Sequence, residues 1–428
     1  MIQPVDGQHI RAVADACMMP TYRRQPLVLV RGQGTRVWDD QGRSYLDLVA
    51  GIAVASVGHC HPRVVQAIQQ QAATLMQVSN LFYTVPQTRL ARLLTQLSGL
   101  EQVFFCNSGA EANEAAIKLA RKATPPGRFE IISALHSFHG RTLASLAATG
   151  QVKYHAGFEP LPPGFRHVPF NDLAALEAAV TPQTAAILLE PVQGEGGVHP
   201  AALEYLQGVR RLCDERGILL ILDEVQTGLG RTGSMFAFQQ YGILPDMVTL
   251  AKALGGGTAI GALLARRPVA QAFQPGTHAS TFGGNPLAAA AALATLEVLV
   301  DEDLPGRAAE AGRYFREALA KLAARQPAIR EIRGLGLLLA VELAPWPQAT
   351  QAEAGHGHAP SPVPAESLAP AVVDAARCRG LLINALGPDT LRLVPPLTIT
   401  PQEIDEAVAI LDQALAEVTH RACLPRTV

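Results

Sequence analysis

The chain has 428 residues, of which 48% are hydrophobic and 17% charged; this composition indicates a globular protein of two or three domains and excludes a disordered one. Its formal net charge of −2 gives no general surface for polyanions, so no nucleic-acid partner is expected. The sequence also lacks an apolar run of membrane-spanning length, a secretory signal and any CxxC pair among its six cysteines, and we expect a cytoplasmic protein that binds no membrane.

The first predicted element is a hairpin over residues 34–46, where alternating segments flank the turn residues Asp40, Gln41 and Gly42. This pattern differs from the alternation of strands and helices that follows it. We therefore assign residues 1–75 to the first part of a smaller domain.

Strand and helix signals alternate through residues 76–305, which we assign to a large domain. The strands are short apolar runs, and the helix after the first of them carries an apolar stripe from Ala112 to Ala123. This alternation predicts an α/β fold with a mostly parallel central sheet covered on both faces. The predicted strands are 103–106, 130–134, 185–189, 219–222 and 247–250.

The C-terminal part has strand character at 329–343 and 391–393, and a helix is predicted from Pro401. Thr400 and Glu403 form a capping box in front of this helix, with proline at its first position. We expect the two chain ends to meet and form the smaller, α+β domain.

A segment rich in Pro, Ala and Gly, residues 344–369, interrupts this C-terminal part, which spans 306–428. Its composition is typical of a flexible insertion. The segment contains His356 and His358, but two ligands alone make a poor metal site, and no metal is expected.

Two ionisable residues stand where parallel sheets place their ligands. Asp223 closes the predicted strand at 219–222, and Lys252 closes the one at 247–250. A lysine at the carboxyl end of a strand can form a Schiff base with an aldehyde, and an aspartate can keep a pyridinium nitrogen protonated. Together they suggest pyridoxal phosphate as cofactor, although each alone is more typical of a solvated charge or a turn cap.

Two loops that follow predicted strands add to this site. Residues 107–110 join a strand to a helix, so their N–H groups and the helix N-terminus can bind a phosphate. Residues 137–142 offer the Phe138 ring to lie against a cofactor and Arg141 to bind a carboxylate. Without further context, core packing would be the simpler role of Phe138.

The ordered motifs of the chain resemble those of the class III aminotransferases, and within them the group that uses acetylornithine. The similarity runs from about Met19 to Ala416 and is broken mainly by the segment 344–369. It implies fold type I of the pyridoxal-phosphate-dependent transferases and a homodimer. The matching stretches are TYRRQPLVLVRGQG, GIAVASVGHCHP, SNLFYT, NSGAEANEAAIKLAR, FHGRTLA, LEPVQGEGG, LDEVQTGLGRTG, LAKALGGG, STFGGNP and LRLVPPL.

The resemblance implies which residues hold pyridoxal phosphate. Lys252 matches the lysine that binds the aldehyde and moves the proton, Asp223 the aspartate that keeps the ring nitrogen charged, and Gln226 the neighbour of the ring hydroxyl. Thr281 matches a threonine that reaches the phosphate of the partner subunit's cofactor. The phosphate loop is matched by Ser108, Gly109 and Ala110, and the stacking aromatic by Phe138.

The resemblance also assigns residues to the two substrates. Arg392 matches the arginine that binds the α-carboxylate of glutamate, and Glu195 the acid that pairs with this arginine while the basic substrate is bound. Arg141 and Tyr22 match residues that hold the α-carboxylate end of an ornithine-type substrate. The remaining residues assigned to substrate binding are Tyr83 and Ser280.

The implied reaction is a ping-pong transamination that, in its reverse direction, feeds arginine biosynthesis. N2-acetylornithine gives its δ-amine and leaves as the semialdehyde, and 2-oxoglutarate takes the amine and leaves as glutamate. Sister activities on ornithine, succinylornithine or 4-aminobutyrate share the same core, and Tyr83 keeps free ornithine open. A glutamate-semialdehyde aminomutase is a more distant alternative, because a mutase has no glutamate half-reaction for Arg392 and Glu195 to control.

Overall fold

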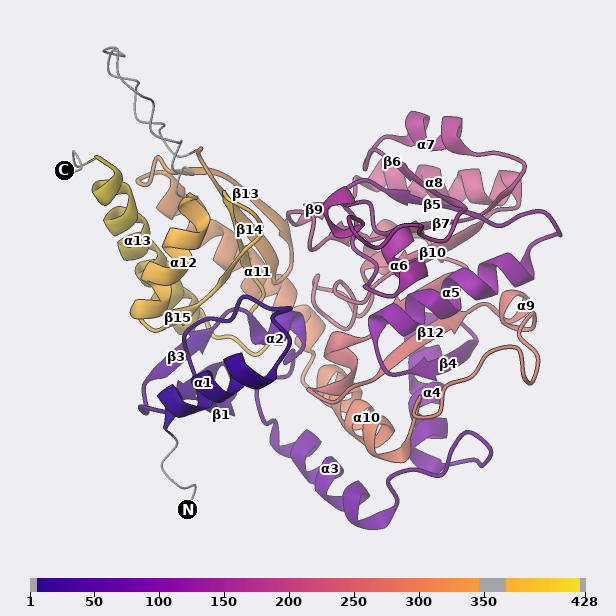
Figure 1. Cartoon of the computed structure of the whole chain (residues 1–428), viewed down its shortest axis with the longest axis horizontal. Coiled ribbons are helices and arrows are strands. Elements are labelled where there is room, and N and C mark those ends of the chain that lie inside the picture. Colours follow the sequence, from indigo (N-terminus) through magenta and orange to yellow (C-terminus); the bar gives the residue numbers. More distant parts are fainter. Residues whose placement is uncertain (1–5, 346–366, 424–428) are drawn as a thin grey trace.

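The computed structural model describes residues 6–345 and 367–423, which form a larger and a smaller part (Figure 1). The larger part contains the central sheet, and the smaller part contains both ends of the described chain. The segment predicted as an insertion, with His356 and His358, lies almost wholly outside the described residues. No helix in the described ranges is long and apolar enough to cross a membrane.

A seven-stranded sheet forms the centre of the larger part, and all five predicted strands belong to it. Its strands run parallel except β12, which is antiparallel to both of its neighbours. This confirms the predicted α/β fold with a mostly parallel sheet. In spatial order the strands are β4 (Gln102–Cys106), β12 (Gly261–Ala265), β11 (Met247–Leu250), β10 (Leu219–Asp223), β7 (Thr184–Leu189), β5 (Glu130–Ala134) and β6 (Phe165–Val168).

Helices cover both faces of this sheet, which explains why its strands are apolar at successive positions. Along β10, Leu220 and Leu222 pack into the cluster on one face, whereas Ile221 packs into a second cluster on the other. The predicted apolar stripe lies on α5 (Gly109–Ala123), which packs into this second cluster. The other helices of this part are α4 (Val85–Ser98), α6 (Leu143–Ala148), α7 (Leu173–Ala179), α8 (Leu203–Arg216), α9 (Arg267–Ala270) and α10 (Pro286–Asp301). Helix α3 (Pro62–Thr74), within the residues predicted for the smaller domain, packs against α10.

The smaller part joins strands from both chain ends, as predicted. β3 (Ser44–Asp47) pairs in parallel with β15 (Leu381–Leu382). Residues 329–343 fold as a hairpin of β13 (Ile329–Leu335) and β14 (Leu338–Leu343), because Gly336 turns the chain with a φ of +54°. The other elements here are α1 (Gly7–Cys17), β1 (Leu29–Gln33), β2 (Arg36–Asp39), α2 (Ala50–Ala53), α11 (Leu304–Ala323), α12 (Leu368–Cys378), β16 (Asn384–Ala385), β17 (Thr390–Leu393) and α13 (Pro401–Cys423).

The capping box in front of α13 is present as predicted. Glu403 accepts a hydrogen bond from the Thr400 backbone at 2.9 Å, and the Thr400 hydroxyl accepts one from the Glu403 backbone at 3.3 Å. The two groups therefore satisfy otherwise unpaired N–H donors at the helix start.

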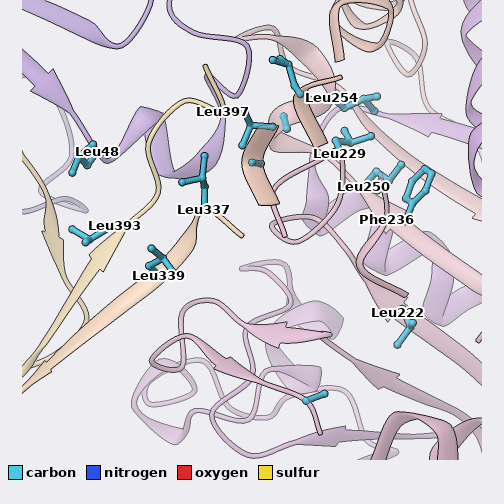
Figure 2. Close-up of a cluster of buried hydrophobic side chains, with 14 of the residues drawn as sticks. Leu48, Leu222, Leu229, Phe236, Leu250, Leu254, Leu337, Leu339, Leu393 and Leu397 are labelled. Carbon is cyan, nitrogen blue, oxygen red and sulfur yellow. The ribbon is translucent and has the colours of Figure 1, made fainter. Parts of the chain in front are cut away.

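One hydrophobic cluster continues from the central sheet into the smaller part. Leu222 and Leu250 reach it from the central sheet, and Leu339 and Leu393 reach it from β14 and β17 (Figure 2). This shared core gives β17 a defined position relative to the carboxyl ends of β10 and β11. The domain boundaries near residues 75 and 305 stay predictions.

Candidate active site

A cavity of about 480 Å³ lies at the carboxyl ends of β10 and β11, where the sequence places a ligand. This volume is typical of a small-molecule site. The assigned residues that line it are Ser108, Gly109, Ala110, Phe138, Arg141, Glu195, Asp223, Gln226 and Lys252.

Lys252 follows β11 and begins a short 3-10 turn, η3 (Lys252–Gly255). Its φ of +40° is rare for a residue with a side chain, and such strain is typical of functional sites. Burial lowers the pKa of Lys252, and the nearby carboxylates of Glu195 and Asp223 oppose this shift without reversing it. A lowered pKa increases the fraction of neutral amine, which is the form that attacks an aldehyde.

Asp223 ends β10, and several partners fix its carboxylate. Its Oδ2 accepts a hydrogen bond from Asn113 Nδ2 at 2.8 Å and lies 2.8 Å from Nδ1 of His139. Its Oδ1 accepts a bond from the Val225 backbone at 3.0 Å. Sequence reasoning gave no role to Asn113 or His139. Asn113 nevertheless carried a signal, because it is a polar residue among the alanines of the predicted helix, and the structure buries it.

The phosphate loop predicted between β4 and α5 opens onto the cavity. Ser108 is the N-cap of α5, and its hydroxyl accepts a hydrogen bond from the Glu111 backbone at 3.2 Å. At Gly109 a Cβ would lie only 2.8 Å from Val225, so a side chain there would collide with the cavity wall. With Ala110, these residues present the positive end of the α5 dipole to a ligand.

Gln226 has an unused hydrogen-bonding group. Its Nε2 donates to Glu195 at 3.4 Å, while its Oε1 is buried with no hydrogen-bond partner in the described part of the chain. An unpartnered buried oxygen is unfavourable unless a ligand group donates to it. The atom therefore suits a hydroxyl donor on a bound ligand.

Phe138 is placed in the cavity by a buried acid. Its backbone N–H donates to Glu190 Oε2 at 3.1 Å. Burial raises the pKa of Glu190 well above the ordinary value, and the charge of Asp223 adds to the shift. Glu190 thus holds the loop that carries Phe138.

Glu195 and Arg392 form an ion pair beside the cavity. The Nη1 atom of Arg392 donates to Glu195 Oε1 at 2.5 Å and to the Gly194 carbonyl at 3.2 Å. The Arg392 side chain is only 1% exposed, so Glu195 compensates a charge that has almost no access to water. Burial works to raise the pKa of Glu195, but the charges of Arg392 and Lys252 lower it, which keeps this acid ionised.

Arg141 also lines the cavity, on the loop after β5. Its guanidinium carbon lies 3.8 Å from the centre of the Tyr154 ring and 5.4 Å from that of Phe138. No group among residues 6–345 and 367–423 forms a hydrogen bond or ion pair with its side chain. Its N–H donors are therefore available to a carboxylate.

Five assigned residues do not line this cavity: Arg392, which lies beside it, and Tyr22, Tyr83, Ser280 and Thr281. The side chains of Tyr22 and Tyr83 are exposed, and Tyr83 faces a separate groove between α3, α4 and α10. Ser280 accepts a hydrogen bond from Asn107 Nδ2 at 3.2 Å, which places it against the phosphate loop. Thr281 is exposed. Their predicted roles in binding stay predictions.

A strand-end lysine, a buried aspartate and a helix N-terminus around one cavity are features of a pyridoxal-phosphate-dependent enzyme. The chain belongs to the class III aminotransferases, since the model of that family, described as Aminotransferase class-III, matches residues 18–415. It is similar to the acetylornithine aminotransferase of Methanothermobacter thermautotrophicus, with 51% identity over 414 residues, or 97% of this chain and 100% of that protein.

Two solved structures share the fold. An ornithine aminotransferase from Toxoplasma gondii, in which pyridoxal phosphate partly occupies the active site, superposes with a TM-score of 0.89 at 34% identity, covering 98% of this chain and 97% of that chain. An acetylornithine aminotransferase from Elizabethkingia anophelis gives a TM-score of 0.83 at 33% identity, covering 96% and 99%. These comparisons confirm the predicted family and its fold type.

Proposed function

We propose that this chain transfers the δ-amino group of N2-acetyl-L-ornithine to 2-oxoglutarate, giving N-acetylglutamate 5-semialdehyde and L-glutamate, as an enzyme of arginine biosynthesis. The observation that carries the proposal is the ion pair of Glu195 with Arg392 beside Lys252. An arginine that a neighbouring acid can mask suits an enzyme whose two substrates differ in charge. The identity of 51% with an acetylornithine aminotransferase over nearly the whole chain supports the choice of donor.

The cavity fits pyridoxal phosphate as the cofactor. The N-terminus of α5 would hold the phosphate, Asp223 the ring nitrogen and Lys252 the aldehyde. The unpartnered Oε1 of Gln226 would accept a hydrogen bond from the ring hydroxyl. When bound, this cofactor supplies a reactive aldehyde and an electron sink.

In the donor half-reaction the chain orients an amine and moves a proton. Arg141 would bind the α-carboxylate of the donor, so that the δ-amine points to Lys252. Glu195 stays paired with Arg392, which keeps that arginine from attracting the same carboxylate into a wrong orientation. The Nζ atom of Lys252, with its lowered pKa, would take the proton from the δ-carbon and deliver it to the carbon that was the cofactor's aldehyde.

In the acceptor half-reaction Arg392 would bind the α-carboxylate of 2-oxoglutarate. This requires Glu195 to leave the arginine, and the Glu195 side chain, at 24% exposure, has more freedom to move than Arg392 at 1%. Arg392 also keeps its bonds to the Gly194 carbonyl and Asn384, so the arginine holds its place when the acid moves. The acid therefore acts as the movable member of the pair.

A homodimer and a cytoplasmic location are part of the proposal. Thr281 is exposed and lies outside the cavity of its own chain, which supports its predicted role at the cofactor of a partner subunit. Large apolar side chains at Leu81, Phe82 and Phe282 are 83%, 66% and 60% exposed, which supports a surface that a second subunit covers. Five cysteines are free thiols, which supports a reducing compartment: Cys17, Cys60, Cys106, Cys213 and Cys378.

The test is a pair of half-reactions on purified protein loaded with pyridoxal phosphate. N2-acetylornithine should bleach the absorbance of the bound cofactor, and 2-oxoglutarate should restore it. Free ornithine is the second candidate donor, favoured by the similarity to the Toxoplasma gondii ornithine aminotransferase. Faster bleaching by ornithine, N2-succinylornithine or 4-aminobutyrate than by N2-acetylornithine would refute the proposed donor.

A further inference from the structure

A tyrosine outside the cavity lining supports the arginine that faces the donor. Tyr154 ends the short turn η1 (Val152–Tyr154) and is half-buried. The guanidinium carbon of Arg141 lies 3.8 Å from the centre of its ring. This short separation is typical of a cation resting on the face of an aromatic ring.

The Tyr154 ring is itself held by two neighbours. It packs edge-on against Phe138, with ring centres 6.1 Å apart and an angle of 85° between the planes. The Lys153 ammonium also lies over this ring, 4.9 Å from its centre. Tyr154 therefore connects the aromatic residue of the cavity to two positive charges.

Stacking leaves the hydrogen-bonding edge of a guanidinium free. A separation of 3.8 Å between the guanidinium carbon and the ring centre leaves room only for the flat face of the Arg141 group against the ring, so its N–H donors project from the edge. No carboxylate or carbonyl in the described ranges takes these donors. A substrate carboxylate can bind them in a bidentate manner without displacing the contact that orients the arginine.

Arg392 is held in a different way from Arg141. Its position is set by hydrogen bonds to Glu195, Gly194 and Asn384. Arg141 has no such partner, so the aromatic rings are what restrict its side chain. Loss of the closer ring should leave Arg141 in many rotamers, and binding a carboxylate would then require ordering it again.

We propose that Tyr154 is a positioning residue that sets the enzyme's recognition of the donor carboxylate by holding Arg141 against its ring. The inference rests on the proposed function, because it takes Arg141 as the ligand of that carboxylate. Lys153 adds a second positive charge at the same ring, so this side of the cavity selects donors with an anionic end.

The test compares Tyr154→Leu with Tyr154→Phe, which keeps the ring. Tyr314→Leu is the matched control, because Tyr314 lies on α11 and bonds to Asp405, away from the cavity. Each holoenzyme is titrated with N2-acetylornithine, with N-acetylputrescine, which lacks the carboxylate, and, in its amine-loaded form, with 2-oxoglutarate. The half-saturation concentration of each absorbance change is measured.

Tyr154→Leu should raise the half-saturation concentration for N2-acetylornithine about 2-fold to 30-fold, the range expected for loss of a cation–π contact. The value for N-acetylputrescine should stay within about twofold, and Tyr154→Phe should restore donor binding. An unchanged donor value in Tyr154→Leu, or equal losses with both donors and the acceptor, would overturn the inference.

Failure of the proposed function would give a different experimental result from failure of the role of Tyr154. In that case the wild-type protein itself would react poorly with N2-acetylornithine and well with another amine. The role of Tyr154 is then tested with that amine and its analogue without the carboxylate, for example ornithine and putrescine. If N-acetylputrescine does not react with the wild type, the contrast between Tyr154→Leu and Tyr154→Phe in donor binding decides alone.

Discussion

Replacing Glu195 by glutamine should affect the two half-reactions in opposite directions. The amide has nearly the shape of the acid, so the change removes the charge that faces Arg392 and little else. Arg392 keeps hydrogen bonds to the Gly194 carbonyl and to Asn384. Its guanidinium then lies almost fully buried without a compensating negative charge.

The size of the effect follows from the geometry of the pair. Two unit charges about 4 Å apart interact by about 4 kcal/mol at an effective dielectric constant of about 20. Removing one partner of a buried ion pair lowers the free energy of unfolding by about 3–5 kcal/mol. Because the Glu195 side chain is 24% exposed, we expect this pair to lie near the lower limit of that range. We expect Glu195→Gln to lower the free energy of unfolding of the cofactor-free protein by about 3 kcal/mol.

The substrates should respond to the unmasked arginine. The dissociation constant of 2-oxoglutarate should fall about tenfold or more. The carboxylate of 2-oxoglutarate would replace Glu195 as the partner of Arg392, and recovering about 1.4 kcal/mol of the lost ion-pair free energy corresponds to this factor. The donor half-reaction with N2-acetylornithine should slow, since the same arginine now competes with Arg141 for the donor carboxylate. L-glutamate should become a better amine donor.

The stability effect should depend on pH in a defined direction. The pKa of Glu195 is lowered in the fold from its ordinary value of 4.5. The stabilisation from ionised Glu195 is therefore fully present above pH 4.5 and is lost as the pH falls through the lowered pKa. Wild type and Glu195→Gln should converge in stability at the acid end of this range.

Thermal unfolding and half-reaction titrations of both proteins measure these effects. Glu406→Gln is the matched control, because Glu406 pairs with Arg36 on the surface, where the side chains are 39% and 30% exposed. That change should alter stability by less than about 1 kcal/mol. Equal weakening of both half-reactions in Glu195→Gln, or unchanged 2-oxoglutarate binding, would refute the masking role.

Three further changes test other parts of the site and fold. Lys252→Ala should abolish turnover while the protein still binds pyridoxal phosphate non-covalently, as seen in the absorbance of the bound cofactor; undiminished turnover would contradict its role. Asn113→Ala removes a 2.8 Å hydrogen bond to Asp223 and should lower kcat about tenfold, corresponding to about 1.4 kcal/mol, with a steady-state assay as the measurement. Arg231→Met leaves the buried carbonyl of Pro395 without its donor and should lower the free energy of unfolding by about 3 kcal/mol, and an unchanged Tm would show that the contact is dispensable.

The central sheet could be predicted from the sequence because its strands are buried on both faces. Such strands are continuous apolar runs, and each of the five predicted ones is a strand of the sheet. β12 and β6 were not predicted. β12 is the short, alanine-containing run GALLA, and it joins the sheet through backbone pairing with β11 and β4 that no local pattern specifies.

Some residues of the site could be predicted from local sequence, and others could not. Asp223 and Lys252 follow directly from strands, so local sequence places them at one edge of the sheet. The pair of Glu195 and Arg392 joins residues 197 positions apart, and only the resemblance to a family suggested it. The contact of Arg141 with Tyr154 depends on how the loops after β5 and α6 fold against each other, and no motif indicated it.

The two arginines of the site need different support because they face different demands. Arg392 must be available to one substrate and masked from the other, so its partner is a charged group that can compete with a carboxylate and can move away. Arg141 is assigned to the donor alone, and a charged partner there would only oppose binding. An aromatic face orients a guanidinium without using its N–H donors, so Tyr154 can fix Arg141 while leaving its full hydrogen-bonding edge to the substrate. Exchanging the two kinds of support should therefore impair both half-reactions. An acid beside Arg141 would weaken the binding of the donor carboxylate. An aromatic residue in place of Glu195 would leave Arg392 without the acid that masks its charge.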